Sequence, residues 1–275
     1  MKKFIFLSIF TFSTLLSFGQ KKEKIKGDRD VISVSEIIVN SFNTVEVDDN
    51  LEVNIKQGSR NSYILTTDKN LVSSVRFTVI DSVLKIYIFR NIVKNKKLEI
   101  DLNVTDIAAI ILKNDAKIKS NNTINTKSFS LSGTDSCEFD LDIEGEKILV
   151  TMQGNVDGKL EFKGETAIIV MNDRTDLDVE LKVETLDVTL NDNAELRADG
   201  KSDLANYTIK KSSDLNARKL EGDDVILNAS NNSDVYLNAS KTLTVSASGK
   251  SEIYVYGKAD IAVKELSDKS KIIKK

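Results

Sequence analysis

The chain has no histidine, no tryptophan and no proline among its 275 residues, and a single cysteine, Cys137. Without histidine it cannot form a Ser-His-Asp or Cys-His catalytic unit, and it lacks the commonest ligand for zinc, iron and copper. A single cysteine cannot close an internal disulfide. The absence of proline suits a chain made almost entirely of sheet ladders, because proline has no N–H to donate. We expect no catalytic residues and no cofactor.

The first residues have the pattern of a secretory signal. Two lysines precede a largely apolar run from Phe4 to Phe18, and small residues up to Gly19 follow, so we expect residues 1–19 to be removed. The alternative is a membrane anchor, but the run is shorter than the roughly 20 residues that a spanning helix needs. Residues 20–32 are mostly charged and are predicted to form a disordered linker.

Signal removal takes away two lysines, which lowers the count of basic residues from 39 to 37 against 42 acidic residues. A mildly acidic exported chain has no electrostatic reason to bind nucleic acid. We therefore expect no nucleic-acid partner, and no transmembrane segment once the signal has been cleaved.

A repeat of about 19 residues runs through the C-terminal two-thirds of the chain. A polar anchor residue followed by an apolar one recurs nine times, at Lys117, Glu138, Asp157, Asp176, Glu195, Asp214, Asp234, Glu252 and Lys271. The successive spacings are 21, 19, 19, 19, 19, 20, 18 and 19 residues. So short a repeat without a helical period is typical of a solenoid, in which each unit buries its apolar face against its neighbours.

Within each repeat, apolar or small residues occupy positions −9, −7 and −5 before the anchor and positions −1, +1 and +3 around it. This period of two indicates strands, and residues such as Asp173 and Gly249 at position −3 indicate a turn between them. We predict an all-β fold, a single-stranded, parallel, right-handed β-helix with rungs of about 19 residues over residues 106–275. Cys137, at position −1, is expected to be a small buried filler.

Residues 33–105 are predicted to form β-strands with hairpin-like connections that lead directly into the β-helix. For example, Val45–Val47 and Leu51–Ile55 alternate on either side of a turn. The one segment with helical character, Thr67–Val75, has apolar spacing too poor to favour a helix. We therefore treat residues 33–275 as one domain.

The chain resembles the DUF2807 family, which is described as an autotransporter adhesin head or GIN domain. The resemblance covers about residues 33–265. It rests on Ser41–Val47 and Leu51–Gly58, and on three turns similar to the family's Ser-Gly-Ser-Gly-Asp-Val turn, namely Asn191–Leu196, Asn231–Val235 and Ser248–Ile253. The resemblance implies an exported or cell-surface β-helical domain, common in Bacteroidetes-like bacteria, and supplies no established activity.

Seven of the nine anchors are acidic. On adjacent rungs these carboxylates would lie about 5 Å apart, close enough to repel one another or to share a hard cation. The dense glycine-rich turns of calcium-binding β-rolls are missing from the sequence, so we expect a solvated acidic ladder without a metal site. Paired carboxylates could also cleave polysaccharides. However, the pattern predicts a uniform ladder rather than one cluster with an arginine or lysine beside it.

Three tyrosines are the candidate ligand-binding residues. Tyr236 and Tyr254 share position +2 on consecutive rungs, and Tyr256 lies two residues further on the same face. Exposed aromatic strips bind sugar rings or protein partners. The alternative is an in-register tyrosine ladder that only stiffens the last rungs.

The sequence therefore predicts an exported, non-enzymatic, adhesin-like binding module in the periplasm, at the cell surface or outside the cell, with an unknown glycan or protein ligand. A carbohydrate-active enzyme on a β-helix and a purely structural envelope protein are the alternatives. We expect a monomer, because lysines at positions 269, 271, 274 and 275 surround the open end of the last rung.

Overall fold

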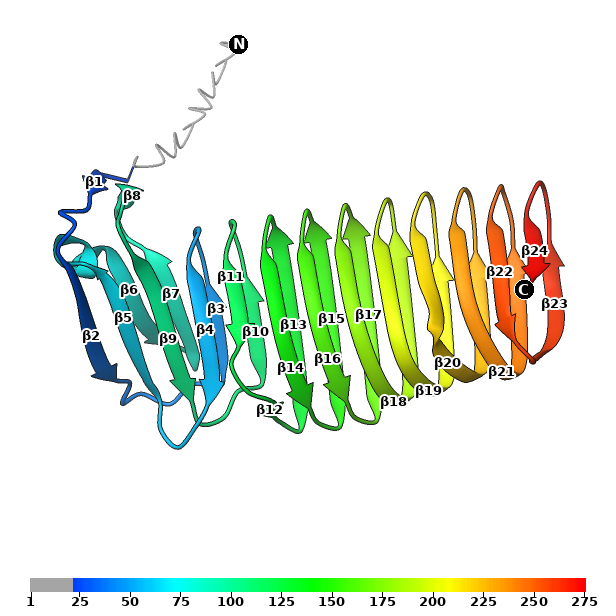
Figure 1. The fold of residues 1–275 in the computed structure, drawn as a ribbon, viewed down its shortest axis with the longest axis horizontal. Coiled ribbons are helices and arrows are strands. Elements are labelled where there is room, and N and C mark those ends of the chain that lie inside the picture. The colour runs from blue at the N-terminus through cyan, green and yellow to red at the C-terminus, as the bar shows by residue number, and fades with distance from the viewer. Residues whose placement is uncertain (1–21) are drawn as a thin grey trace, which may run out of the picture.

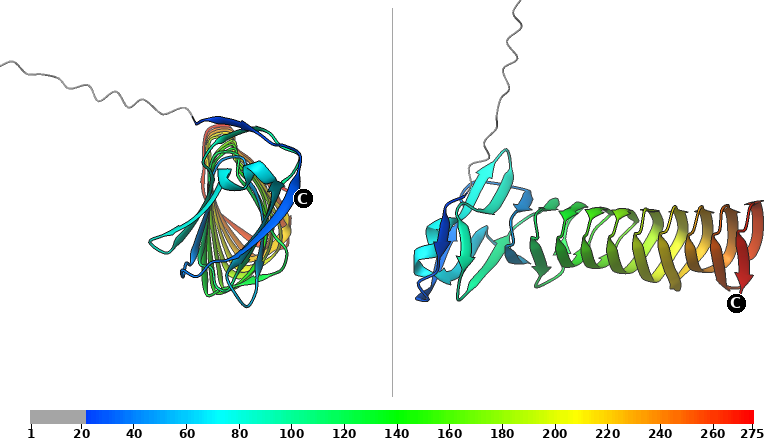
Figure 2. Two further views of the ribbon diagram at one scale, coloured as in Figure 1. Left: turned by 90° about the vertical axis from the view of Figure 1, so that its left-hand side faces the viewer. Right: turned by 90° about the horizontal axis from the view of Figure 1, so that it is seen from above.

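The short alternating runs of the sequence form β-strands in the computed structural model, which describes residues 22–275. The predicted signal peptide, residues 1–19, lies outside the described residues. The chain winds into stacked coils that form an elongated rod (Figure 1). Seen from the end, each coil is flattened, so that two sheets face each other across a narrow core (Figure 2).

Each C-terminal coil consists of one strand, a tight turn and a second strand that returns in the opposite sheet. The early coils contain β10 (Ala109–Leu112), β11 (Lys117–Ser120), β12 (Ile124–Asn125), β13 (Ser128–Asp135), β14 (Glu138–Glu144), β15 (Lys147–Gly154), β16 (Asp157–Lys163) and β17 (Thr166–Asp173). The later coils contain β18 (Asp176–Asn191), β19 (Glu195–Ile209), β20 (Asp214–Ala229), β21 (Asp234–Ala247), β22 (Glu252–Gly257), β23 (Asp260–Leu266) and β24 (Lys271–Lys274). Strands β18 to β21 are long because the connection to the next coil stays extended.

Equivalent strands pair in parallel from one coil to the next. Leu177 of β18 lies opposite Leu196 of β19, which in turn lies opposite Leu215 of β20. The register shifts in β20, where an additional residue near Arg218 forms a bulge. This pairing confirms the parallel β-solenoid with coils of about 19 residues.

The core consists of the columns that the repeat predicted. Almost every residue at positions −9, −7, −5, −1, +1 and +3 is buried, with Ala108, Gly158 and Ile272 among the half-buried exceptions. A further buried column was not predicted. It lies at position +5 and contains Ile143, Phe162, Leu181, Leu220 and Ala239.

The turns also form where they were predicted. Residues at position −3 have positive φ angles, for example 66° at Asp173, 70° at Asn231 and 75° at Gly249. Lys211, at the same position, also has a positive φ of 61° although it is neither glycine nor Asx. The stacking of the coils therefore imposes the left-handed conformation even where the residue does not favour it.

The N-terminal strands close one end of the rod. They are β1 (Lys24–Lys26), β2 (Val31–Ile37), β3 (Thr44–Val47), β4 (Glu52–Gln57), β5 (Ser62–Asp68), β6 (Val75–Ile80), β7 (Val83–Ile88), β8 (Asn91–Lys94) and β9 (Leu98–Val104). One sheet continues from β13 through β10, β3 and β7 to β6. The other continues from β14 through β11, β4, β9 and β5 to β2. Strands β2, β5 and β6 join these sheets in antiparallel fashion and cap the rod.

Three expectations about this region were wrong. Strands β3 and β4 do not form a hairpin with each other, because they pair in parallel with β7 and β10 and with β9 and β11. They form a complete coil of the solenoid, with Glu52 opposite the anchor Lys117. The predicted disordered linker contains β1, which pairs with β8, and the start of β2. The segment Lys69–Ser74 forms a 3-10 helix, η1, since packing of Leu71 and Ser74 overrides its weak helical pattern.

Candidate functional site

The outward side chains of one sheet make up a strongly charged surface. These side chains lie at the anchor, +2 and +4 positions of β14, β16, β22 and the first halves of β18 to β21, and we call this surface the acidic face. Anchors in adjacent coils are direct neighbours, as the pairs Glu138–Asp157 and Asp157–Asp176 illustrate. The acidic ladder predicted from the repeat is therefore present, but cations interrupt it.

Arg197 interrupts the ladder most strongly. Its Nη2 donates to both oxygens of Asp176 at 2.6 and 2.8 Å, and its Nε donates to Asp178 at 2.6 Å. A third carboxylate, that of Glu195, accepts from Nη1. Hydrogen bonds to these carboxylates raise the pKa of the guanidinium above its usual value. The prediction of a uniform ladder was therefore wrong at this point, where one arginine gathers three acids from two coils.

The sequence contained a signal for this cluster. Arg197 occupies position +2, and parallel stacking places it directly beside Asp178 of the preceding coil. Reading each column along the rod, rather than each coil along the chain, would have identified the cluster.

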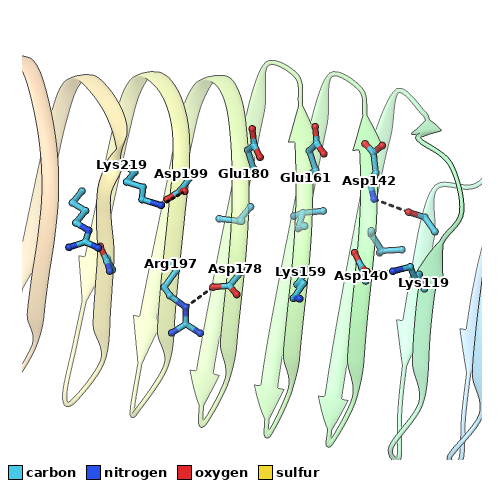
Figure 3. A pocket seen from close by; sticks show the side chains of 16 residues that line it. Lys119, Asp140, Asp142, Lys159, Glu161, Asp178, Glu180, Arg197, Asp199 and Lys219 are labelled. Carbon is cyan, nitrogen blue, oxygen red and sulfur yellow. Dashed lines mark hydrogen bonds and ion pairs between the residues drawn. The ribbon is translucent and has the colours of Figure 1, made fainter.

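A shallow groove of about 560 Å³ runs along the acidic face beside this cluster (Figure 3). Its charged side chains lie in two rows, one of Lys119, Asp140, Lys159, Asp178 and Arg197, the other of Asp142, Glu161, Glu180, Asp199 and Lys219. Lys119 Nζ lies 2.5 Å from Asp140, and Lys219 Nζ lies 3.1 Å from Asp199. The first row alternates in sign, which suits a ligand that contacts several coils at once.

Some anchors have no cation close by. The pKa of Asp157 is raised, first by partial burial and then by the charges of Asp176 and Glu138. The pKa of Asp214 and of Asp234 is raised by partial burial and by the next carboxylate in the ladder. At the end of the ladder the pKa of Glu252 is lowered, because Tyr254 and Lys271 donate to it.

Among residues 22–275, no group of three or more Cys, Asp or Glu side chains is arranged to hold a metal ion. The ladder places its carboxylates in single file along the rod, whereas calcium needs six to eight oxygen ligands around one point. The absence of a tight calcium site stays a prediction for solution experiments.

The structure brings the three candidate tyrosines together at the C-terminal end of the acidic face. The rings of Tyr236 and Tyr254 stack with centroids 4.7 Å apart and an interplanar angle of 7°. Lys275 Nζ lies 5.1 Å from the centroid of Tyr254, whose hydroxyl donates to Glu252 at 2.8 Å. Tyr256 lies opposite Asn238. Because the first two rings stack on each other, each has one face already covered, which favours contacts through ring edges and hydroxyls.

Comparison with known proteins places the chain in a family. The family model described as "Putative auto-transporter adhesin, head GIN domain" (DUF2807) matches residues 41–167 and 153–259. The chain belongs to this family. No curated protein sequence matches it. Among the described residues, no helix is long and apolar enough to cross a membrane.

Solved structures from two Parabacteroides species share the fold. A putative adhesin from Parabacteroides merdae aligns with a TM-score of 0.67 at 17% identity, covering 92% of this chain and 99% of that one. A putative adhesin from Parabacteroides distasonis aligns with a TM-score of 0.65 at 18% identity, covering 92% and 100%. A putative lipid-binding protein from the same species also has a TM-score of 0.65, at 15% identity, covering 92% and 99%. At these identities the likeness establishes the fold alone.

Proposed function

We propose that this DUF2807 protein is an exported, non-enzymatic, adhesin-like binding module of the cell envelope that holds its ligand on the acidic face. The observation that carries the proposal is the groove itself, a row of charges of alternating sign that extends over several coils around Arg197. A shallow surface of this kind suits an extended polar ligand, and a deep, water-excluding pocket would suit catalysis better.

The ligand class follows from the donors and acceptors in the groove. Paired carboxylates and cations offer both acceptors and donors at intervals of about 4.8 Å, the spacing of the coils. A glycan chain or an extended protein segment can use such a row, because each presents donors and acceptors at regular intervals. Tyr236, Tyr254 and Tyr256 are candidate contacts at the C-terminal end of the row, mainly through the hydroxyls and the exposed edges of their rings.

A glycan array combined with a depolymerisation assay on residues 20–275 tests the proposal. We expect binding without turnover, and a loss of binding of at least ten-fold in Arg197→Ala. The matched control is Lys211→Ala, which removes a cation paired with Asp192 at the turn edge, outside the groove. Equal binding by both variants contradicts the placement of the ligand, and silence in both assays favours a purely structural envelope protein.

One observation favours the enzyme as a second candidate. Asp157 has a raised pKa, while its neighbour Asp176 is held by Arg197. Two neighbouring carboxylates in different environments are the arrangement of an acid–base pair in glycoside hydrolysis. If the depolymerisation assay detects turnover, Asp157→Asn should abolish it, and the non-enzymatic proposal then fails.

A further inference from the structure

The side of the rod opposite the acidic face carries almost no charge. On the seven coils from β13 to β21, its outward side chains lie at positions −8, −6 and −4, and we call this surface the neutral face. Only Asp187 and Lys210 are charged among these positions, although 29% of the whole chain is charged. The remaining positions hold Thr, Ser, Asn, Gln and aliphatic residues.

The neutral face satisfies many of its polar groups internally. Asn191 Nδ2 donates to Asn172 at 3.0 Å, and Asn206 Nδ2 donates to Asp187 at 2.7 Å, each from one coil to the next. The single acidic side chain of the face is therefore already hydrogen-bonded along the rod. A partner that covers the face consequently displaces water from few unpaired groups.

The same face exposes aliphatic side chains. Leu149 and Ile226 are 37% and 41% exposed, and Ile168 and Val170 lie half-buried between them. The methyl groups of Thr151 and Thr189 stand in the same column as Val170. Together these groups give the middle of the face an apolar character, with hydroxyls and amides around it, as in the core and rim of protein interfaces.

We propose that the neutral face is the contact surface of a homodimer, in which two copies of this chain pack neutral face to neutral face. This inference goes beyond the proposed function and does not depend on it. Two flat sheets can pack about 10 Å apart through such side chains, as sheets do within a β-sandwich. The solenoid supplies a flat sheet because its coils are in register.

The area of the face is sufficient for a stable dimer. Seven coils about 4.8 Å apart, with strands of about six residues, give a face of roughly 650 Å². Two copies would bury about 1,300 Å² in total, within the range of about 1,200–2,000 Å² that stable, specific interfaces bury.

Charge selects this face over the others. Two acidic faces would repel each other, and burying their ion pairs would remove many charges from water. The lysine-rich tail restricts association at the end of the rod but places no restriction on its side. The occupant that matches an uncharged, flat and partly aliphatic surface is therefore a second, identical one.

Sedimentation velocity on residues 20–275 over about 1–100 μM tests the proposal, together with a matched pair of variants. Thr189→Lys adds a charge at the centre of the neutral face, and Asn216→Lys adds the same charge at a half-buried outward position of the acidic face. We expect a dimer that Thr189→Lys weakens at least ten-fold and that Asn216→Lys leaves intact. Far-ultraviolet circular dichroism and thermal melts confirm that both variants are folded.

Cross-linking provides a second, independent measurement. Cys137 is buried, with only 1% of its surface exposed, so an introduced cysteine is the reactive thiol of the folded chain. A short bismaleimide should link Thr189→Cys into a covalent dimer and leave Asn216→Cys monomeric.

Three outcomes overturn the proposal. They are a monomer at about 100 μM, a dimer that only Asn216→Lys weakens, and a monomeric protein that neutral polysaccharides retard in gels unless Thr189 is replaced by lysine. The last outcome assigns the neutral face to a glycan. Glycan-array binding by Thr189→Lys is measured separately, so failure of the dimer and failure of the proposed function are distinguishable.

Discussion

At the residue scale, the position before each anchor holds a small side chain that donates a hydrogen bond into the turn. The Sγ of Cys137 donates to the carbonyl of Thr134 at 2.8 Å. The hydroxyls of Ser233 and Ser251 make the same bond to the residue three positions earlier, also at 2.8 Å. The lone cysteine therefore has the same role as the serines in its column, and burial raises the pKa of its thiol.

We predict that Cys137→Ser changes the free energy of unfolding by less than about 1 kcal/mol, because the serine hydroxyl preserves the hydrogen bond at nearly the same volume. Cys137→Leu, which adds volume beside the turn, should lower stability by about 1–3 kcal/mol. Urea denaturation measures both. Native protein should also resist a thiol reagent that reacts once the chain unfolds, and rapid labelling of the native protein contradicts this account.

A second residue-scale prediction concerns Asp157. Its pKa is raised above the ordinary value of 3.8, so the folded state binds a proton more tightly than the unfolded chain does. The ionised carboxylate therefore makes stability fall as pH rises through the interval above 3.8, and the loss persists at neutral pH. Asp157→Asn should raise stability at pH 7 by about 0.3–0.5 kcal/mol, the size typical of exposed charge interactions, and the gain should disappear near pH 3.

Asp178→Asn is the matched control for this prediction. It neutralises a carboxylate of the same face that is paired with Arg197 at 2.6 Å, so it should leave stability unchanged or lower it. Thermal melts at pH 3, 5 and 7 compare the two variants. If Asp157→Asn lowers stability at pH 7 as well, like-charge repulsion is not the dominant influence on Asp157.

At the scale of the strand and the coil, the sequence predicted what repeats and missed what does not. Period-two columns located the core and the turns, because every coil meets the same neighbours and so needs the same pattern. The β3–β4 coil was missed since its nearest counterpart, β10–β11, lies 65 residues later at the anchors Glu52 and Lys117. The Arg197 cluster was missed because ion pairs between coils depend on columns, and nothing within one coil indicates them. The ligand-binding role of the tyrosines stays a prediction.

Gly158 is the element-scale exception that the apolar pattern did not explain. It occupies position +1, where other coils have a large apolar residue, and the ring of Phe139 from the preceding coil fills its place. A Cβ added to Gly158 would lie 2.2 Å from Phe139 Cζ. The two residues therefore share the volume of two ordinary core side chains.

We predict that Gly158→Ala lowers the free energy of unfolding by about 1–3 kcal/mol, through overpacking against the ring. In a Phe139→Leu background the same substitution should have a smaller effect, because the shorter side chain leaves room for a methyl group. A double-mutant cycle measured by urea denaturation gives the coupling. Equal effects of Gly158→Ala in both backgrounds contradict the shared-volume explanation.

At the scale of the whole molecule, the two ends of the rod differ. The N-terminal end has antiparallel strands, whereas the last coil ends in β23 and β24, which pair only with the preceding coil in the described part of the chain. Lys271 Nζ lies 3.2 Å from Glu252, so the tail is held on that coil by charge as well as by its ladder. Lysines along an edge strand disfavour further strand pairing.

Truncation after Leu266, or exchange of the four tail lysines for Val and Thr, should therefore promote end-to-end association beyond that of the intact chain. Light scattering at increasing concentration measures this, and we expect filaments or larger oligomers. The exchange variant retains β24, so it separates loss of charge from loss of a strand. An exchanged protein whose mass stays equal to that of the intact chain shows that the lysines do not protect the end.

The position of the β3–β4 coil also determines in what order the rod can be assembled. The coil lies between β7 and β9 on one side and β10 and β11 on the other, although it precedes all of them in the chain. Once residue 104 is in place, the N-terminal end can be complete, and every later coil needs only the coil before it. A chain that emerges N-terminus first can thus close its most non-local pairings early. It can then add coils one at a time, with each new strand meeting a finished edge as it appears.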